Sequence, residues 1–240
     1  MIYFISDLHL SPLTPGAKGI FERFLKHIAQ PENQLFILGD FFDAWVGDDA
    51  CDEAFNRDVV SGLAQAVQQG LDIRIQRGNR DFLLGQVFAD QTGISLLDDP
   101  YVLSTPEWQF VLSHGDSLCT DDLAYQQFRT QVRSTAWQHN FLAKPLAERL
   151  GIAEHMRAES QSINQGKSAD LMDLNPSATD DFLRQYGYAT FIHGHTHQPA
   201  QHDHIVDGIH VERWVLSDWC ETQGEALCWD GEQLNRLALN

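Results

Sequence analysis

Side chains that commonly bind metal ions stand in five short segments of this chain. They are Asp7, His9, Asp40, Asn79, His114, His195 and His197. Asp7 and His9 lie two residues apart, so in an extended segment both side chains face the same way and can hold one ion. His195 and His197 share that spacing. A mixture of carboxylate, amide and imidazole ligands suits borderline divalent ions such as Mn²⁺, Fe²⁺ or Zn²⁺, and Mn²⁺ is our first expectation.

Each segment alone has a simpler explanation, because a lone Asp-x-His or His-x-His is more often a polar turn or a core histidine than a metal site. Coincidence is a poor explanation for five such segments, each of which follows an apolar run and carries a glycine or a polar turn. Glycine lets the backbone turn tightly and approach a ligand closely, and it stands at Gly39, Gly78, Gly115 and Gly194. His193 follows two apolar residues and is interpreted as a buried, hydrogen-bonded histidine.

The elements that must position these segments are short apolar runs alternating with amphipathic stretches. Strands are predicted over residues 2–5, 35–38, 73–75, 110–112 and 189–192. Helices are predicted over residues 19–29, 53–69 and 176–186, the last with Asn175 as its N-cap before Pro176. This alternation indicates an α/β fold. In open α/β sheets ligands bind beyond the carboxyl ends of the strands, so distant segments can converge there.

Two other stretches have a different pattern. After His197 the residues alternate, which predicts strands over 210–216, 225–229 and 234–239 that form a meander, with a turn at Asp230-Gly231. Residues 121–173 are predicted to be mostly helical, with a break at Lys144-Pro145. We therefore expect one domain over residues 1–240 with an inserted helical cap at about 121–173.

Charge is distributed unevenly along the chain. The formal net charge of -18 opposes nucleic-acid binding, which depends on Lys and Arg displacing counterions from phosphates. Residues 123–167, however, carry six basic and only three acidic side chains among apolar ones. That segment suits anions or anionic lipid, although an ordinary solvated helix face explains it equally well. The four cysteines are interpreted as buried thiols, and the absence of a signal-peptide pattern or an apolar span favours a cytoplasmic protein.

The five segments resemble the calcineurin-like metallophosphoesterase superfamily over nearly the whole chain. The resemblance is carried by Asp7-Leu8-His9, Gly39-Asp40, Gly78-Asn79-Arg80-Asp81, Ser113-His114-Gly115-Asp116 and Gly194-His195-Thr196-His197. It implies an α/β/β/α sandwich with two metal ions. It also implies that one ion is bound by Asp7, His9, Asp40 and His197, and the other by Asp40, Asn79, His114 and His195, so that Asp40 bridges the two.

The residues around 39–45, 78–82, 114–122 and 157–160 carry a narrower resemblance within that superfamily, to a pyrophosphatase of an acylated UDP-sugar lipid. It implies attack of metal-activated water on the α-phosphorus, and peripheral association with the cytoplasmic face of the inner membrane, weakened by salt. A monomer is the default expectation. The implied substrate contacts are Asn79, Arg80, Asp122, Ser160, Asn164, Lys167 and His195. Asp43 departs from the pattern, since glutamate is expected there.

Position 80 bears on the type of reaction. The wider superfamily usually has histidine there, which can protonate a poor leaving group, whereas this chain has Arg80. Arginine cannot act as a general acid. A phosphate monoester leaves without a proton because its second pKa is only about 6, so cleavage of a pyrophosphate fits. Two other functions stay open, namely hydrolysis of a soluble nucleotide and a non-enzymatic metal-binding scaffold, although the complete ligand set argues against the scaffold.

Overall fold

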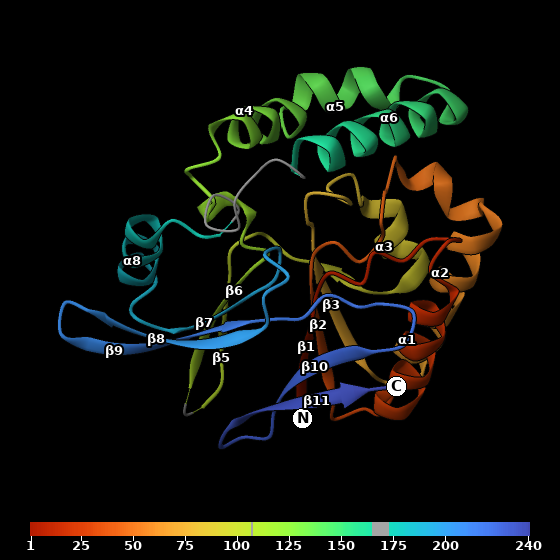
Figure 1. The fold of residues 1–240 in the computed structure, drawn as a ribbon. Helices are drawn as coiled ribbons and strands as arrows, with labels where there is room; N and C mark the ends of the chain where they lie inside the picture. The colour runs from red at the N-terminus through yellow and green to blue at the C-terminus, as the bar shows by residue number, and fades with distance from the viewer. Residues whose placement is uncertain (107, 165–172) are drawn as a thin grey trace.

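Two mixed β-sheets lie face to face in the computed structural model, which describes residues 1–106, 108–164 and 173–240, without the side chains of 161–164 (Figure 1). The first sheet has the order β11-β10-β1-β2-β3-β4. Strands β1 to β4 are parallel, and β10 and β11 are antiparallel to their neighbours. The strands are β1 (Ile2–Ile5), β2 (Gln34–Leu38), β3 (Asp72–Gln76), β4 (Ser95–Leu96), β10 (Gly224–Trp229) and β11 (Leu234–Leu239).

The second sheet has the order β5-β6-β7-β9-β8, with β6, β7 and β9 parallel. Its strands are β5 (Tyr101–Ser104), β6 (Gln109–Ser113), β7 (Thr190–His193), β8 (Ala200–Val206) and β9 (Ile209–Val215). The predicted meander is wrong in one respect. Strand β9 lies in this second sheet between β7 and β8, whereas β10 and β11 pair in the first sheet. Alternation identifies a strand but does not say which sheet it joins.

Helices cover the outer face of each sheet, which confirms the α/β/β/α sandwich. Helices α1 (Pro15–Ile28), α2 (Ala54–Gln68) and α3 (Gln86–Thr92) pack on the first sheet, and α8 (Pro176–Gln185) packs on the second. In β1, Ile5 faces the helices while Phe4 lies between the two sheets. Strands buried on both faces explain why these segments are continuous apolar runs.

Between the sheets' carboxyl ends and solvent lie helices α4 (Leu123–Val132), α5 (Thr135–Leu142) and α6 (Leu146–Asn164). The predicted break at Lys144-Pro145 falls between α5 and α6. Short 3-10 helices also occur at Asp48–Asp52 and Asp116–Leu118. That these helices form a functional cap inserted in one domain stays a prediction. None of the described helices has the length and apolar character needed to cross a membrane.

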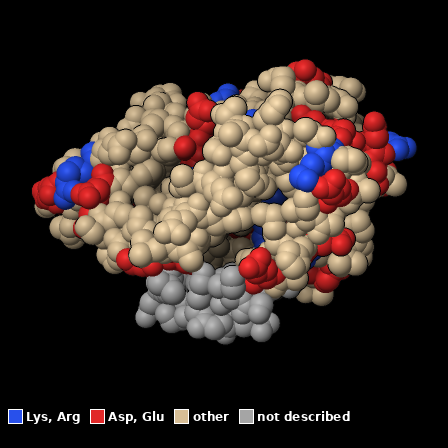
Figure 2. All heavy atoms as spheres, turned by 90° about the horizontal axis from the view of Figure 1, so that it is seen from above, with Lys and Arg blue, Asp and Glu red and all other residues tan. Residues whose placement is uncertain are grey.

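The described basic residues of α4 to α6 are largely engaged in ion pairs within the protein, and the anion-binding surface that their number suggested stays a prediction. Arg129 binds buried Asp116, and Arg149 is itself buried and binds Asp49. Arg157 forms an ion pair with Asp43. Figure 2 looks down on the molecule from the side of these helices, and Lys and Arg atoms cover little of that face. The helices therefore use much of their positive charge to bind carboxylates of the protein itself.

The cysteine interpretation needs one correction. Cys51, Cys119 and Cys228 are buried as expected, but Cys220 is exposed, in the loop between β9 and β10.

Candidate metal centre

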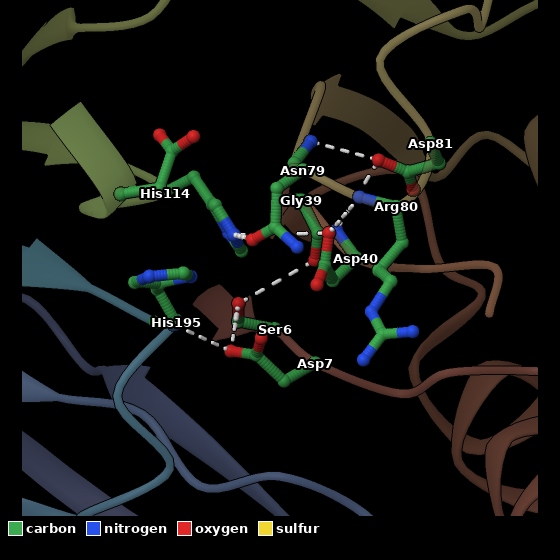
Figure 3. A network of polar contacts seen from close by, with 12 residues as sticks. Ser6, Asp7, Gly39, Asp40, Asn79, Arg80, Asp81, His114 and His195 are labelled. Atoms are coloured by element: carbon green, nitrogen blue, oxygen red, sulfur yellow. Dashed lines mark hydrogen bonds and ion pairs between the residues drawn. The ribbon is translucent and has the colours of Figure 1, made fainter. Parts of the chain in front are cut away.

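All seven predicted ligands converge at the carboxyl ends of five strands from both sheets. Asp7 and His9 follow β1, Asp40 follows β2, and Asn79 follows β3, all in the first sheet. From the second sheet come His114, after β6, and His195 and His197, after β7. Figure 3 shows side chains from both sheets around a common centre.

Two groups of ligand atoms are close enough to hold an ion. In each group the atoms lie within 4.8 Å of one another, and the groups are Asp7, His9 and His197, and Asp7, Asp40 and His114. Asp40 has one carboxylate oxygen 3.9 Å from His9 Nδ1 and the other 3.7 Å from His114 Nε2. Asp7 belongs to both groups, and Asp40 faces one histidine of each, so both carboxylates lie between the two groups. The resemblance implies that Asp40 is the bridging one.

Asn79 and His195 extend the second group. Asn79 Oδ1 lies 2.9 Å from His114 Nε2. The rings of His195 and His114 have centroids 5.1 Å apart. The structure thus brings these two predicted ligands to the same side of the centre as His114.

The backbone at five of these residues is unusual. Asp7, His9, Asp40, His195 and His197 have φ between 47° and 68°. This left-handed region is sparsely populated by residues other than glycine and costs of the order of 1 kcal/mol or more each. Such conformations concentrate at functional sites.

Two of the predicted glycines are required by close contact with the carboxylates. A Cβ atom on Gly78 would lie 2.1 Å from Asp40 Oδ1, and one on Gly194 would lie 2.3 Å from Asp7 Oδ2. The expectation that glycine permits close approach at these positions is confirmed.

Residues outside the predicted ligand set hold the loops together. Buried Asp81 accepts hydrogen bonds from Gly78 N at 2.7 Å and Phe41 N at 2.8 Å, so it joins the loops after β2 and β3. Ser6 Oγ donates to Asp7 Oδ2 at 2.6 Å. Asp218 lies 3.7 Å from His197 Nδ1. Asp81 stands inside a recognised motif, which could have indicated a role, but no sequence signal marked Asp218.

The electrostatics of the centre fit bound cations. Burial, together with neighbouring Asp7, raises the pKa of Asp40 to about 6. Burial beside Asp40 likewise raises the pKa of Asp81 to about 7. Carboxylates buried this close together disfavour ionisation unless a positive charge compensates them. For Asp7, burial is outweighed by the hydrogen bond to His197 and by the charges of the neighbouring histidines, which hold its pKa below the usual range. In addition, His9 Nδ1 is buried with no hydrogen-bond partner among the described residues. The donor set therefore suits divalent metal ions.

The histidines of the centre differ in charge. Burial lowers the pKa of His114, but the carboxylates of Asp40 and Asp7 outweigh it and raise the value to about 9. Both ring nitrogens of His114 face oxygen atoms, of Leu38 and Asn79, as a protonated ring requires. Burial and nearby His114 lower the pKa of His195 to about 4. His195 is therefore neutral at pH 7, the form in which imidazole binds metals.

His193 is buried and hydrogen-bonded, as predicted. It lies 2.8 Å from Gly194 O through Nδ1 and 3.1 Å from Arg213 through Nε2. Burial and the Arg213 charge lower its pKa to about 3. Since a guanidinium only donates, Nε2 accepts and Nδ1 carries the proton.

The structure describes only some of the predicted substrate-binding residues. Arg80 N donates to Asp40 Oδ1 at 2.8 Å, and its guanidinium lies 4.0 Å from Asp43 Oδ1. Asp122 is buried and caps α4 by accepting from Tyr125 N at 3.1 Å. Ser160 is exposed on α6. The side chain of Asn164 and all of Lys167 lie outside the described residues.

The model of the family described as calcineurin-like phosphoesterase matches residues 1–199. The chain therefore belongs to the calcineurin-like phosphoesterase family. Within it, the chain is similar over most of its length to proteins named UDP-2,3-diacylglucosamine hydrolase. The one from Bordetella pertussis is 46% identical over 220 residues, which cover 91% of this chain and 85% of that protein. Those of Aeromonas hydrophila and Chromobacterium violaceum are 45% and 42% identical, covering 96% and 99% of this chain and 95% and 98% of theirs.

Proposed function

We propose that this protein hydrolyses the pyrophosphate bond of UDP-2,3-diacylglucosamine to give UMP and 2,3-diacylglucosamine 1-phosphate, in lipid A biosynthesis. The observation that carries the proposal is the meeting of seven metal-binding side chains from both sheets, in a chain 46% identical to a protein of that name. The protein is thus an enzyme of the phosphoric anhydride hydrolase type.

Two divalent ions, proposed to be Mn²⁺, would be held by two overlapping sets of ligands. Asp7, His9, Asp40 and His197 would bind one ion, and Asp40, Asn79, His114 and His195 the other. Such a pair supplies an activated water and stabilises the negative charge on the attacking and leaving oxygens. The chain's own contribution is to place these ligands rigidly, through Asp81, Ser6 and the strained backbone.

Arg80 is proposed to neutralise the leaving phosphate. Its backbone bond to bridging Asp40 places it beside the centre, and Asp43 lies next to its guanidinium. A guanidinium can bind phosphate oxygens with two parallel hydrogen bonds but does not deliver a proton. With water attacking the α-phosphorus, the leaving group is a sugar 1-phosphate, which suits this role because it needs no proton near pH 7.

The proposed membrane contact, at the cytoplasmic face of the inner membrane, rests on apolar side chains. Because Arg129, Arg149 and Arg157 bind carboxylates of the protein, the electrostatic attraction to anionic lipid that we expected has less support. Exposed apolar side chains are present on all three helices, at Leu123, Phe128, Leu142 and Leu150. We therefore propose a peripheral contact that depends mainly on apolar burial.

The test is release of UMP from the acylated UDP-sugar with and without Mn²⁺, in the wild type and in His195→Ala. We expect activity that is lost on chelation and reduced at least about a hundredfold in the variant, because a ligand is removed. Dinucleoside polyphosphates and cyclic nucleotides serve as competing substrates. Faster turnover of one of these would replace the proposed substrate. Stoichiometric bound manganese with no phosphoester hydrolysis would indicate a scaffold.

A further inference from the structure

Helix α4 is joined to the loop of His114 through one buried carboxylate. Asp116, two residues after His114, is fully buried. Its Oδ2 accepts hydrogen bonds from Tyr125 Oη at 2.6 Å and Arg129 Nε at 2.7 Å, and Arg133 lies 3.5 Å away. These three partners are spaced four residues apart, so they lie along one face of the helix.

The same face of α4 reaches two more loops of the centre. The Arg133 guanidinium also donates to Gly78 O at 2.9 Å, directly before Asn79. The ring of Tyr125 lies 5.8 Å from the ring of His195. Residues that bind Asp116 therefore also contact the loops of Asn79 and His195.

These contacts are unevenly divided between the two proposed ions. Asn79, His114 and His195 belong to one ligand set. In the described part of the chain, no hydrogen bond or ion pair joins α4 to Asp7, His9 or His197. That second set is supported instead by Ser6, by Asp218 and by Trp219 N, which donates to Asp7 O at 3.1 Å.

We propose that Asp116 is a positioning residue that couples helix α4 to the ion held by Asp40, Asn79, His114 and His195, without being a ligand itself. The inference rests on the proposed metal centre. It predicts that loss of the Asp116 charge lowers the affinity for one ion and leaves the affinity for the other unchanged.

The strength of this connection comes from charge. The buried carboxylate of Asp116 forms ion pairs with the guanidinium groups of Arg129, at 2.7 Å, and Arg133, at 3.5 Å. Hydrogen bonds to an ionised acceptor are about twice as strong as those between neutral groups. Asparagine has the same shape but removes the charge and offers one acceptor oxygen.

The experiment titrates metal-free protein with Mn²⁺, following binding by calorimetry and free Mn²⁺ by electron paramagnetic resonance. We expect two ions per wild-type chain. In Asp116→Asn we expect one ion at wild-type affinity and the other weakened about 10- to 100-fold, the usual effect of removing an outer-shell partner. Arg133→Gln, which removes the bond to Gly78 O, should weaken the same ion, and it carries the test if Asp116→Asn does not fold.

The matched control is Asp49→Asn. Asp49 binds Arg149 of α6 and thus also joins these helices to the body, but among the described residues it forms no hydrogen bond or ion pair with a metal loop. The Asp49→Asn variant should bind both ions with wild-type affinity. If Asp116→Asn lowered the affinity for both ions equally, or lowered neither, the inference would be overturned while the proposed function would stand. A wild type that binds no metal would overturn the proposed function and this inference with it.

Discussion

Several residues of the candidate metal centre have backbone conformations or buried charges that are rare in proteins. Five ligands have left-handed backbone, and the carboxylates of Asp7, Asp40 and Asp81 are buried together. Strain of this kind persists only where neighbouring bonds fix it. At this scale sequence reasoning could identify the seven candidate ligands that the structure brings together, because their types and their places after strands are visible. It could not identify Asp218 or the contacts of Asp116, because these depend on loops that meet only in the folded chain.

Gly78→Ala should weaken metal binding strongly. The new Cβ would meet Asp40 Oδ1 at 2.1 Å and Asp40 N at 2.3 Å, so the carboxylate proposed to bridge the two ions must move. We expect at least about a tenfold loss of Mn²⁺ affinity by calorimetry, comparable to losing an outer-shell contact. Gly62→Ala, in helix α2 with open space at its Cβ position, is the control. It should keep metal affinity and add about 0.5–1 kcal/mol of stability.

Arg80→Ala should slow turnover while metal content stays near normal. Removing a charged hydrogen-bond donor to the leaving phosphate costs about 1.5–3 kcal/mol, or roughly 10- to 150-fold in kcat/KM. Steady-state kinetics and metal analysis of the same sample measure both quantities. Arg80→Lys keeps the charge but loses the paired geometry, so it should fall in between. Loss of metal from Arg80→Ala, which keeps the backbone bond to Asp40, would show that the Arg80 side chain supports the metal centre and that its proposed role at the leaving phosphate is wrong.

The metal-free protein should lose stability as pH rises from about 6.5 to about 9. His114 has a pKa raised to about 9 by Asp40 and Asp7, against 6.5 when unfolded. The folded state therefore binds the His114 proton more tightly than the unfolded state does. The resulting gain in the free energy of unfolding is complete below pH 6.5 and is lost as the pH rises through 9. The shift corresponds to a few kcal/mol, at about 1.4 per pH unit. Urea unfolding with chelator present measures it. A His114→Asn variant with an equally steep pH dependence would contradict this assignment.

The secondary-structure elements that the sequence analysis missed were short, like β5 with four residues, or lacked an apolar run. Strand β4 has only two residues, and α3 has seven, preceded by Gly85. Strand β8 lies at a sheet edge and alternates between partly buried and exposed residues rich in His and Asp, so it lacks an apolar run. Helices α4 to α6 were expected from sequence, but their basic side chains point to carboxylates far away in sequence, which composition cannot show.

The exposed leucines of helices α4 to α6 lead to a specific prediction about membrane binding. Sedimentation with vesicles of phosphatidylethanolamine and phosphatidylglycerol should show binding that persists in high salt, because apolar contacts are not screened. Replacing Leu142 and Leu150 with glutamate should weaken it at least about tenfold, since burying a charge in place of an apolar side chain is unfavourable. Leu237→Glu, at a similarly exposed leucine on β11, should have no effect. Release of the wild type by salt alone would restore an electrostatic mechanism.

For the whole molecule, the metal centre is where the two sheets are joined at their carboxyl ends. Asp7, His9, Asp40 and Asn79 come from the first sheet, while His114, His195 and His197 come from the second. Ions bound here would therefore hold the sandwich together, in addition to the apolar layer between the sheets.

Metal removal should consequently lower the unfolding temperature of the entire chain. Each ion present at a hundredfold excess over its Kd adds about 2.7 kcal/mol. For a chain of this size two ions should raise the midpoint by roughly 10–20 °C, measured by calorimetry with and without chelator. Asp40→Asn should lose most of this gain because the bridging ligand is altered. Its metal-free midpoint should nevertheless exceed that of the metal-free wild type, because the pKa of Asp40 is raised to about 6 and its ionised form destabilises the fold at pH 7. A metal-free Asp40→Asn protein less stable than metal-free wild type would mean that the buried carboxylates do not repel one another, and that cations are not needed to compensate them.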